Sequence, residues 1–86
     1  MKFGVYSIRD VKVGFLNPTF EMSDAVSRRN FSHAVLNNTD SLFFSHPEDY
    51  SLYKIGTFDT ETGKLLPLDV PLQLVDAISV IDGIGK

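Results

Sequence analysis

The side chains that most often carry chemistry in proteins are sparse in this chain and stand apart from one another. Its two histidines, His33 and His46, fall on different expected elements without HxH or HExxH spacing, so they predict no metal site. There are no cysteines, which excludes disulfides, thiolate catalysis and cysteine-type zinc sites. Serine and aspartate are plentiful, but no GxSxG nucleophile elbow supports them. We therefore expect a protein that is not an enzyme and that has no catalytic residues, metal or cofactor.

The acidic run at residues 59–63, DTETG, also has a structural explanation. It resembles a fragment of a cation-binding loop, but the alternating oxygen ligands of an EF-hand, ending in glutamate, are absent. Gly63 suits the positive φ of a hairpin loop, so the run predicts a turn. The other glycines are scattered and do not form a phosphate-cradling loop.

Four residues make up the candidate nucleic-acid-binding site. Arg28 and Arg29 are the only adjacent basic pair, and a guanidinium matches phosphate oxygens in a bidentate fork. Tyr53 and Lys54 on a strand would add a stacking ring and a positive charge. The alternatives are a solvated helix face for the arginines and core positions for some strand aromatics. The net charge of −3 disfavours general DNA coating, because such binding depends on basic residues.

Residues 24–36 carry the strongest helix signal. Ser23 is a good N-cap, and Asp24 complements the positive end of the helix dipole. The helical period places Val26, Phe31, Ala34 and Val35 on one buried side. Asparagine at 37–38 is expected to close the helix in the left-handed conformation.

The strand signals predict a small, mainly antiparallel sheet of about three to four strands. Residues 1–10 read as an interior strand with two apolar faces. Residues 51–58 and 64–68 form a hairpin, with a bulge or close approach at Gly56 and an edge at Pro67. Residues 14–22 are expected to be a loop in which Phe15, Leu16 and Phe20 plug the edge of the core; the alternative is an exposed partner-binding surface.

The chain therefore predicts one α+β domain at 1–81, with the helix packed on the sheet and a flexible tail at 82–86. Residues 71–81 fit either a helix or a strand, and the β-branched second half favours extended structure. No stretch is apolar enough for a membrane span, so no membrane association is expected. A chain of 86 residues buries a modest share of its surface, which favours a homo-oligomer.

The run HPEDYSLYKIGTFDTETG at 46–63, with NPTF at 17–20 and DAVSRRNF at 24–31, resembles a viral family. It is similar to the small nonstructural protein of gokushoviruses, which are single-stranded DNA phages of the Microviridae. The resemblance covers most of the chain in the same order and fades beyond Leu65. Ser23 stands where relatives often carry asparagine, a change that preserves capping.

The resemblance implies a protein made in the host bacterial cytoplasm and absent from the mature virion. It implies a nonenzymatic role in regulating viral single-stranded DNA synthesis or packaging, as a homo-oligomer and through contacts with a viral replication or capsid-precursor protein. Relatives are often described as DNA-binding, so direct binding of single-stranded DNA is the alternative. No catalytic residue comes with the resemblance.

Overall fold

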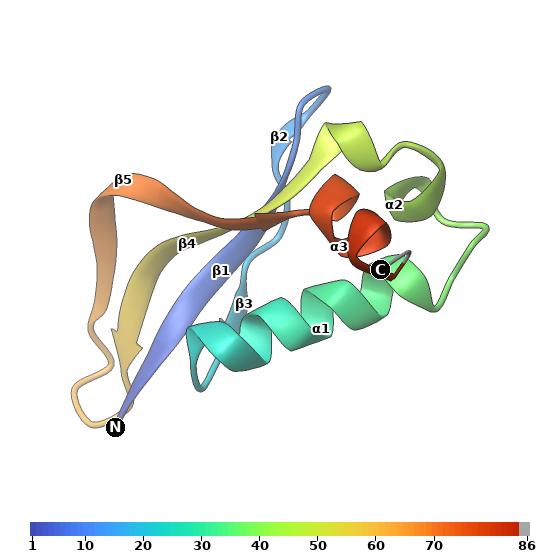
Figure 1. Cartoon of the computed structure of the whole chain (residues 1–86). Coiled ribbons are helices and arrows are strands. Elements are labelled where there is room, and N and C mark those ends of the chain that lie inside the picture. Colours follow the sequence, from blue (N-terminus) through green and yellow to red (C-terminus); the bar gives the residue numbers. More distant parts are fainter. Residues whose placement is uncertain (85–86) are drawn as a thin grey trace.

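The structure is a computed structural model that describes residues 1–84 of the chain (Figure 1). Its elements are, in chain order, β1 (Lys2–Asp10), β2 (Gly14–Phe15), β3 (Thr19–Glu21), α1 (Asp24–Leu36), α2 (Leu42–Ser45), the 3-10 turn η1 (Pro47–Asp49), β4 (Tyr50–Asp59), β5 (Leu65–Asp76) and α3 (Ala77–Ile84). The predicted α+β fold is confirmed.

The described strands form one curled antiparallel sheet of five strands (Figure 1). Their order is β2–β1–β4–β5, and β3 also pairs with β1. Strand β1 pairs with β4 along its whole length on one side and with β2 and β3 on the other. This interior position explains why both of its faces carry apolar side chains. The sheet contains more strands than expected because two short ones form in the segment 14–22.

That segment was expected to be a loop, and the prediction is wrong. Gly14 has a φ of 112°, which lets the chain reverse after Asp10 so that β2 pairs with the end of β1. Asn17 and Pro18 then interrupt the pairing, and the chain returns to β1 as β3, where Phe20 lies opposite Val5. The turn-forming residues that suggested a loop separate two short strands.

Helix α1 begins and ends at the predicted residues. The Ser23 hydroxyl accepts a hydrogen bond from the Val26 amide at 3.2 Å, as a capping residue should. Its fully buried side chains are Ser27, Phe31 and Val35. Ala34, predicted to be buried, is exposed at a cleft beside the helix. Asn37 closes the helix with a φ of −94°, not in the left-handed conformation, and its side-chain amide donates to the His33 carbonyl at 3.0 Å.

The core lies between α1 and the face of the sheet that the helix covers. Its buried cluster consists of Tyr6, Phe31, Val35, Tyr50, Leu52 and Ala77. Phe43 of α2 packs against this cluster, with its ring centroid 4.7 Å from that of Tyr50 and 6.5 Å from that of Phe31. Phe43 therefore packs the connection down onto the sheet, and Pro47 occupies the first position of η1, where proline is favoured.

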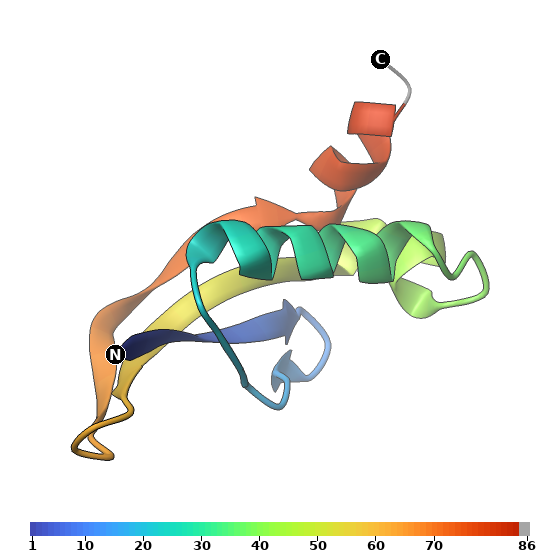
Figure 2. The same cartoon turned by 90° about the horizontal axis from the view of Figure 1, so that it is seen from below.

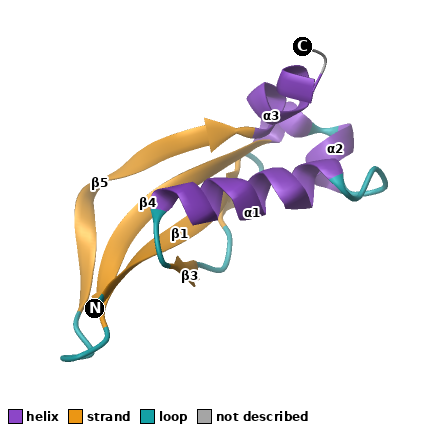
Figure 3. Cartoon of the chain, turned by 60° about the horizontal axis from the view of Figure 1, so that its bottom comes forward, coloured by secondary structure: helices purple, strands orange, loops and turns teal. Residues whose placement is uncertain are grey.

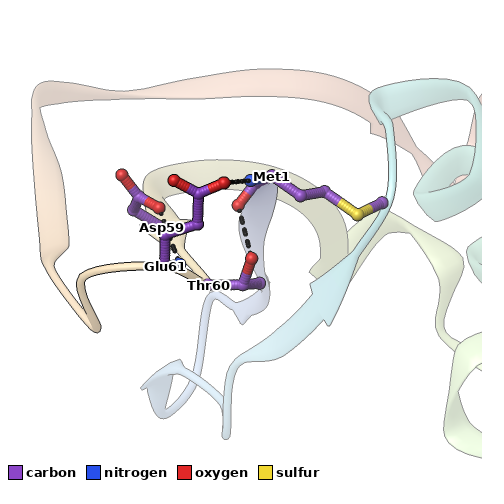
Figure 4. A network of polar contacts seen from close by, with 4 residues as sticks. All are labelled: Met1, Asp59, Thr60 and Glu61. Carbon is purple, nitrogen blue, oxygen red and sulfur yellow. Dashed lines mark hydrogen bonds and ion pairs between the residues drawn. The ribbon is translucent and has the colours of Figure 1, made fainter.

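The turn between β4 and β5 is tied to the start of the chain (Figure 4). The amide and the hydroxyl of Thr60 each donate to the Met1 carbonyl at 2.9 Å. The Met1 amino group lies 3.8 Å from the Glu61 carboxylate, and Asp59 Oδ1 accepts from the Glu61 amide at 2.9 Å. Gly63 has a φ of 72°, as the loop requires. The predicted hairpin near 51–68 and the predicted turn at 59–63 are confirmed.

Strand β5 continues to Asp76, beyond the point where Pro67 was expected to end it. Residues 65–67 and 72–76 both pair with β4, while residues 68–71 bulge away from it opposite Ile55. Pro71 lies in the bulge, where its missing N–H removes no hydrogen bond from the ladder. The bulge at Gly56 is confirmed.

The chain changes from strand to helix at Asp76, whose Oδ1 accepts from the Ser79 amide at 2.7 Å. Val80 and Ile81 of α3 pack against the core. The second half of 71–81, expected to favour extended structure, is helical because the cap and this burial outweigh β propensity. The structure also differs from the expected tail at 82–86: residues 82–84 complete α3, and residues 85–86 lie outside the described part.

Candidate interaction surface

The two faces of the sheet have different cover. Helix α1 lies across one face, α2 and α3 stand at one end, and no helix within residues 1–84 crosses the opposite face (Figures 2 and 3). We call that opposite face the outer face. Directly opposed residues on neighbouring strands point to the same side, so the strand registers assign its members. They are Phe3, Val5, Ser7, Arg9, Phe15, Phe20, Ser51, Tyr53, Gly56, Phe58, Leu65, Pro67, Gln73 and Asp76.

Aromatic rings dominate the outer face. Phe15 meets Tyr53 edge to face with ring centroids 5.3 Å apart, and Phe20 meets Phe58 in the same way at 5.5 Å. Phe15 remains 46% exposed and Phe20 remains 48% exposed. They do not plug the edge of the core, as expected, but stand half in solvent. Of the two interpretations of this segment, an exposed surface fits the structure.

A hollow adjoins these rings on the β5 side of the sheet. Its volume is about 270 Å³, and its lining is apolar. The lining residues are Val5, Ile55, Gly56, Leu65, Leu66 and Pro67. The hollow lies beside the point where residues 68–71 bulge away from β4, and Gly56, which has no side chain, lets the backbone of Leu66 and Pro67 approach closely. Sequence alone pointed to a bulge at Gly56 but not to the space beside it.

The opposite, helix-covered side holds the main buried polar group. The Tyr6 hydroxyl donates to Asp24 Oδ1 at 2.6 Å, and Lys54 Nζ lies 3.3 Å from the same oxygen. Burial, and then the hydrogen bond to Asp24, raises the pKa of Tyr6 well above its usual range. The Tyr6 hydrogen bond and then Lys54 hold the pKa of Asp24 below its ordinary value. This cluster fastens the start of α1 to β1 and β4.

The model of the Phage ORF5 protein family matches residues 3–80, which include every residue of the outer face. The chain belongs to the Phage ORF5 protein family. No curated protein and no solved structure matches this ORF5-family chain. None of the helices in its residues 1–84 is long and apolar enough to cross a membrane.

The four residues proposed for nucleic-acid binding lie on two sides of the ORF5-family protein. Tyr53 points to the outer face, whereas its neighbour Lys54 points to the helix-covered side and pairs with Asp24. Arg28 and Arg29 are exposed on α1. Arg28 lies near enough to Asp24 to lower its pKa, so part of this positive charge is balanced locally. The structure therefore groups Arg28 with Lys54 and separates both from Tyr53.

Other polar side chains of the ORF5-family protein contact one another in pairs. A cleft of about 160 Å³ between α1 and the β3 segment is partly polar, and there the Asn30 amide donates to Glu21 at 3.0 Å. His33 contacts Asn37, and His46 contacts Ser45. No three His, Cys, Asp or Glu side chains of the described residues come together in a group that could hold a metal ion. The arrangement is suited to binding through surfaces.

Proposed function

We propose that this ORF5-family chain is a nonenzymatic, nonstructural protein of a gokushovirus-type phage, which regulates viral single-stranded DNA synthesis or packaging through protein contacts as a homo-oligomer. The observation that carries the proposal is the outer face, on which four aromatic rings and an apolar hollow stand without cover. Large contiguous apolar surfaces on small proteins mark interaction sites. The phage family and the resemblance at 46–63 support the viral setting.

In this proposal the protein acts in the cytoplasm of the infected bacterium and is absent from the mature virion. Its partners are further copies of itself and a viral replication or capsid-precursor protein. The residues of the outer face act by packing, and no side chain acts on a substrate.

The test is an infection with phage whose copy of this gene carries Phe15→Ser and Phe20→Ser. Both rings lie outside the core cluster, so the variant protein should accumulate normally. We expect duplex viral DNA to persist while single-stranded genomes or filled particles fall by roughly tenfold or more, as the loss of interface anchors implies.

Leu42→Ser is the matched control, because Leu42 is 61% exposed on α2 and lies off the outer face. It should leave both yields unchanged. Normal yields of genomes and filled particles from the double variant would refute the proposed function.

The aromatic pairs favour one second candidate, direct binding of single-stranded DNA on the outer face. Bases stack on exposed aromatic rings, and Arg9 lies directly opposite Phe15. Fluorescence anisotropy of an oligothymidylate across a salt series tests this candidate. Salt-sensitive binding that is lost in Phe15→Ser and Tyr53→Ser would support it; loss in Arg28→Ala and Arg29→Ala would assign DNA to α1. Absence of binding at low salt by the folded protein would exclude both.

A further inference from the structure

One cross-strand row of the outer face carries a protruding ring at one end and the hollow at the other. The row runs through Phe20 on β3, Val5 on β1, Gly56 on β4 and Pro67 on β5. The Phe20 ring is about half exposed, whereas Val5, Gly56 and Pro67 line the hollow. The same surface therefore presents both a knob and a hole, separated by about two strand widths.

We propose that the outer face binds a second copy of this chain and that the Phe20 ring of each copy enters the hollow of the other. Consider a two-fold axis that runs parallel to the strands, over the middle of the row between β1 and β4. Rotation about it reverses the order of the strands, so that Phe20 of each copy lies over Pro67 of the other. Such a contact is closed and self-complementary, as in most homodimers. The inference rests on the proposed function in one respect: both hold that a protein binds the outer face.

The hollow has the size and chemistry to accept the ring. An apolar cavity of about 150 Å³ is large enough to bind benzene. The hollow, at about 270 Å³, exceeds that volume and is lined by aliphatic side chains and Gly56. The Phe20 ring carries no polar group, so burying it in the hollow breaks no hydrogen bond with water. The transfer of the ring from water into the hollow is therefore favourable.

The charges of the outer face also suit a second copy. Its two charged residues, Arg9 and Asp76, are opposite in sign and share one cross-strand row with Ser51. The same two-fold axis places Arg9 of each copy over Ser51 and beside Asp76 of the other. The chain as a whole is acidic, with a net charge of −3, but the strand registers assign no other charged residue to this face. The face itself carries no net charge, because Arg9 and Asp76 cancel, and each Arg9 lies one strand spacing from both Asp76 and Arg9 of the other copy.

The outer face approaches the area of a standard dimer interface. Strands β1, β4 and β5 have 9, 10 and 12 residues, and the short strands β2 and β3 both lie along the other side of β1. At about 4.8 Å between strands and about 3.3 Å per residue, a sheet of this outline spans roughly 19 × 30 Å, or about 570 Å² in projection. The accessible surface exceeds this projection because the rings protrude. A standard interface buries about 800 Å² per partner, which is about one seventh of the 5603 Å² exposed by the chain.

The free edge of β5 is a poorer place for a second copy. Edge-to-edge pairing needs a straight row of backbone donors and acceptors. Two prolines, Pro67 and Pro71, remove donors from β5, Asp69 adds a charge, and residues 68–71 bulge away from β4. These are features that keep exposed strands from pairing. The face of the sheet remains as the surface open to a second copy.

Mass in solution tests the proposal first. Sedimentation equilibrium of the full chain should give twice 9.6 kDa, with a dissociation constant in the micromolar range or tighter. Phe20→Ser should weaken the dimer by about thirtyfold for each of the two ring contacts. Leu72→Ser, at an exposed β5 residue that points to the helix-covered side, should leave it unchanged. A chain that stays monomeric at millimolar concentration would overturn the proposal.

Disulfide cross-linking between two different cysteine variants then tests how the two copies dock. In the mixed dimer, one of the two contacts between Phe20 and the hollow remains intact. The chain contains no cysteine, so introduced thiols are unambiguous. Under mild oxidation, a mixture of Phe20→Cys and Leu65→Cys chains should form a mixed disulfide at least tenfold faster than a mixture of Phe20→Cys and Leu72→Cys. Leu65 lines the hollow, whereas Leu72 points to the other side of the sheet. Equal rates from a dimeric protein would overturn the proposed docking.

The outcomes separate the dimer from the proposed function. Suppose that the protein is a dimer with the expected disulfides, but that Phe15→Ser and Phe20→Ser leave the phage unaffected. The dimer would then be kept and the proposed function rejected. A monomer whose double variant still blocks genome or particle formation would keep the regulatory role through a viral partner protein, and would reject both the dimer and the homo-oligomer in the proposed function. A monomer that binds an oligothymidylate through Phe15 and Tyr53 would overturn the dimer, because DNA would then be what covers the face.

Discussion

The substitution Gly56→Ala is expected to destabilise the sheet where the backbone of β5 approaches Gly56 of β4. A Cβ atom on Gly56 would lie 2.6 Å from the Leu66 carbonyl oxygen and 3.3 Å from the Pro67 Cα. Both neighbours are backbone atoms, so no change of side-chain rotamer relieves the contact. Strand β5 must therefore shift, and with it the hollow of the outer face.

The size of the effect follows from two opposing terms. Overpacking of this kind costs about 1–3 kcal/mol. Alanine reduces the freedom of the unfolded chain relative to glycine, which offsets about 0.4–1 kcal/mol. The midpoints of these ranges leave a net loss of about 1.3 kcal/mol in the free energy of unfolding. Urea unfolding should show a lower midpoint with an unchanged slope, and the dimer proposed above should weaken because the hollow is reshaped.

Two other glycines serve as controls for the steric argument. A Cβ atom on Gly83 meets nothing within 4 Å, and Gly83 lies in α3, so Gly83→Ala should stabilise the protein by up to about 1 kcal/mol. Gly63 also has open space but a φ of 72°, so Gly63→Ala should cost about 1 kcal/mol through the backbone alone. If Gly56→Ala proves as stable as the parent chain, the reasoning about β5 is refuted.

Other substitutions test the contacts on the helix-covered side. Tyr6→Phe removes a hydrogen bond to a charged acceptor and should cost about 1.5 kcal/mol in urea unfolding, at the low end of the usual range because Lys54 still pairs with Asp24; no loss would contradict the role of this bond. Because the folded-state pKa of Asp24 lies below its ordinary value of 3.8, its contribution to stability is present above that pH and is lost as the pH falls through the folded-state pKa. The gap in stability between the parent chain and Asp24→Asn should therefore narrow below pH 3.8, and a constant gap in unfolding experiments from pH 7 to pH 2 would argue against this coupling. Val35→Ala empties a fully buried site and should cost about 2–3 kcal/mol, measured by thermal unfolding; a cost below 1 kcal/mol would mean that the core under α1 collapses around the gap. Asp76→Ala removes the cap of α3 and should cost about 1 kcal/mol, with faster hydrogen exchange confined to α3 if the cap acts locally.

The sequence by itself determined those local structures whose conformation depends on residues close together in the chain. Helix α1 could be predicted to the residue, because its N-cap, its first acidic residue and its apolar period all lie within thirteen residues. The hairpin turn followed from Gly63, and the single helical turn followed from Pro47. The absence of cysteine and of a metal-binding histidine pattern is likewise a property of composition. These features depend on contacts within one turn of the backbone.

Only the tertiary structure decided the features that depend on pairing between distant residues. Phe15 follows Gly14 and Phe20 lies two residues after Pro18, and their strand conformation comes from pairing with β1, which the local sequence does not reveal. The second half of β5 is held by β4 some twenty residues earlier, and α3 by the core beneath it. Tyr53 and Lys54 are neighbours in sequence, yet the strand directs one to the outer face and the other to α1. Which face stays uncovered is set by where α1 packs, so the candidate interaction surface could be identified only once the sheet was assembled.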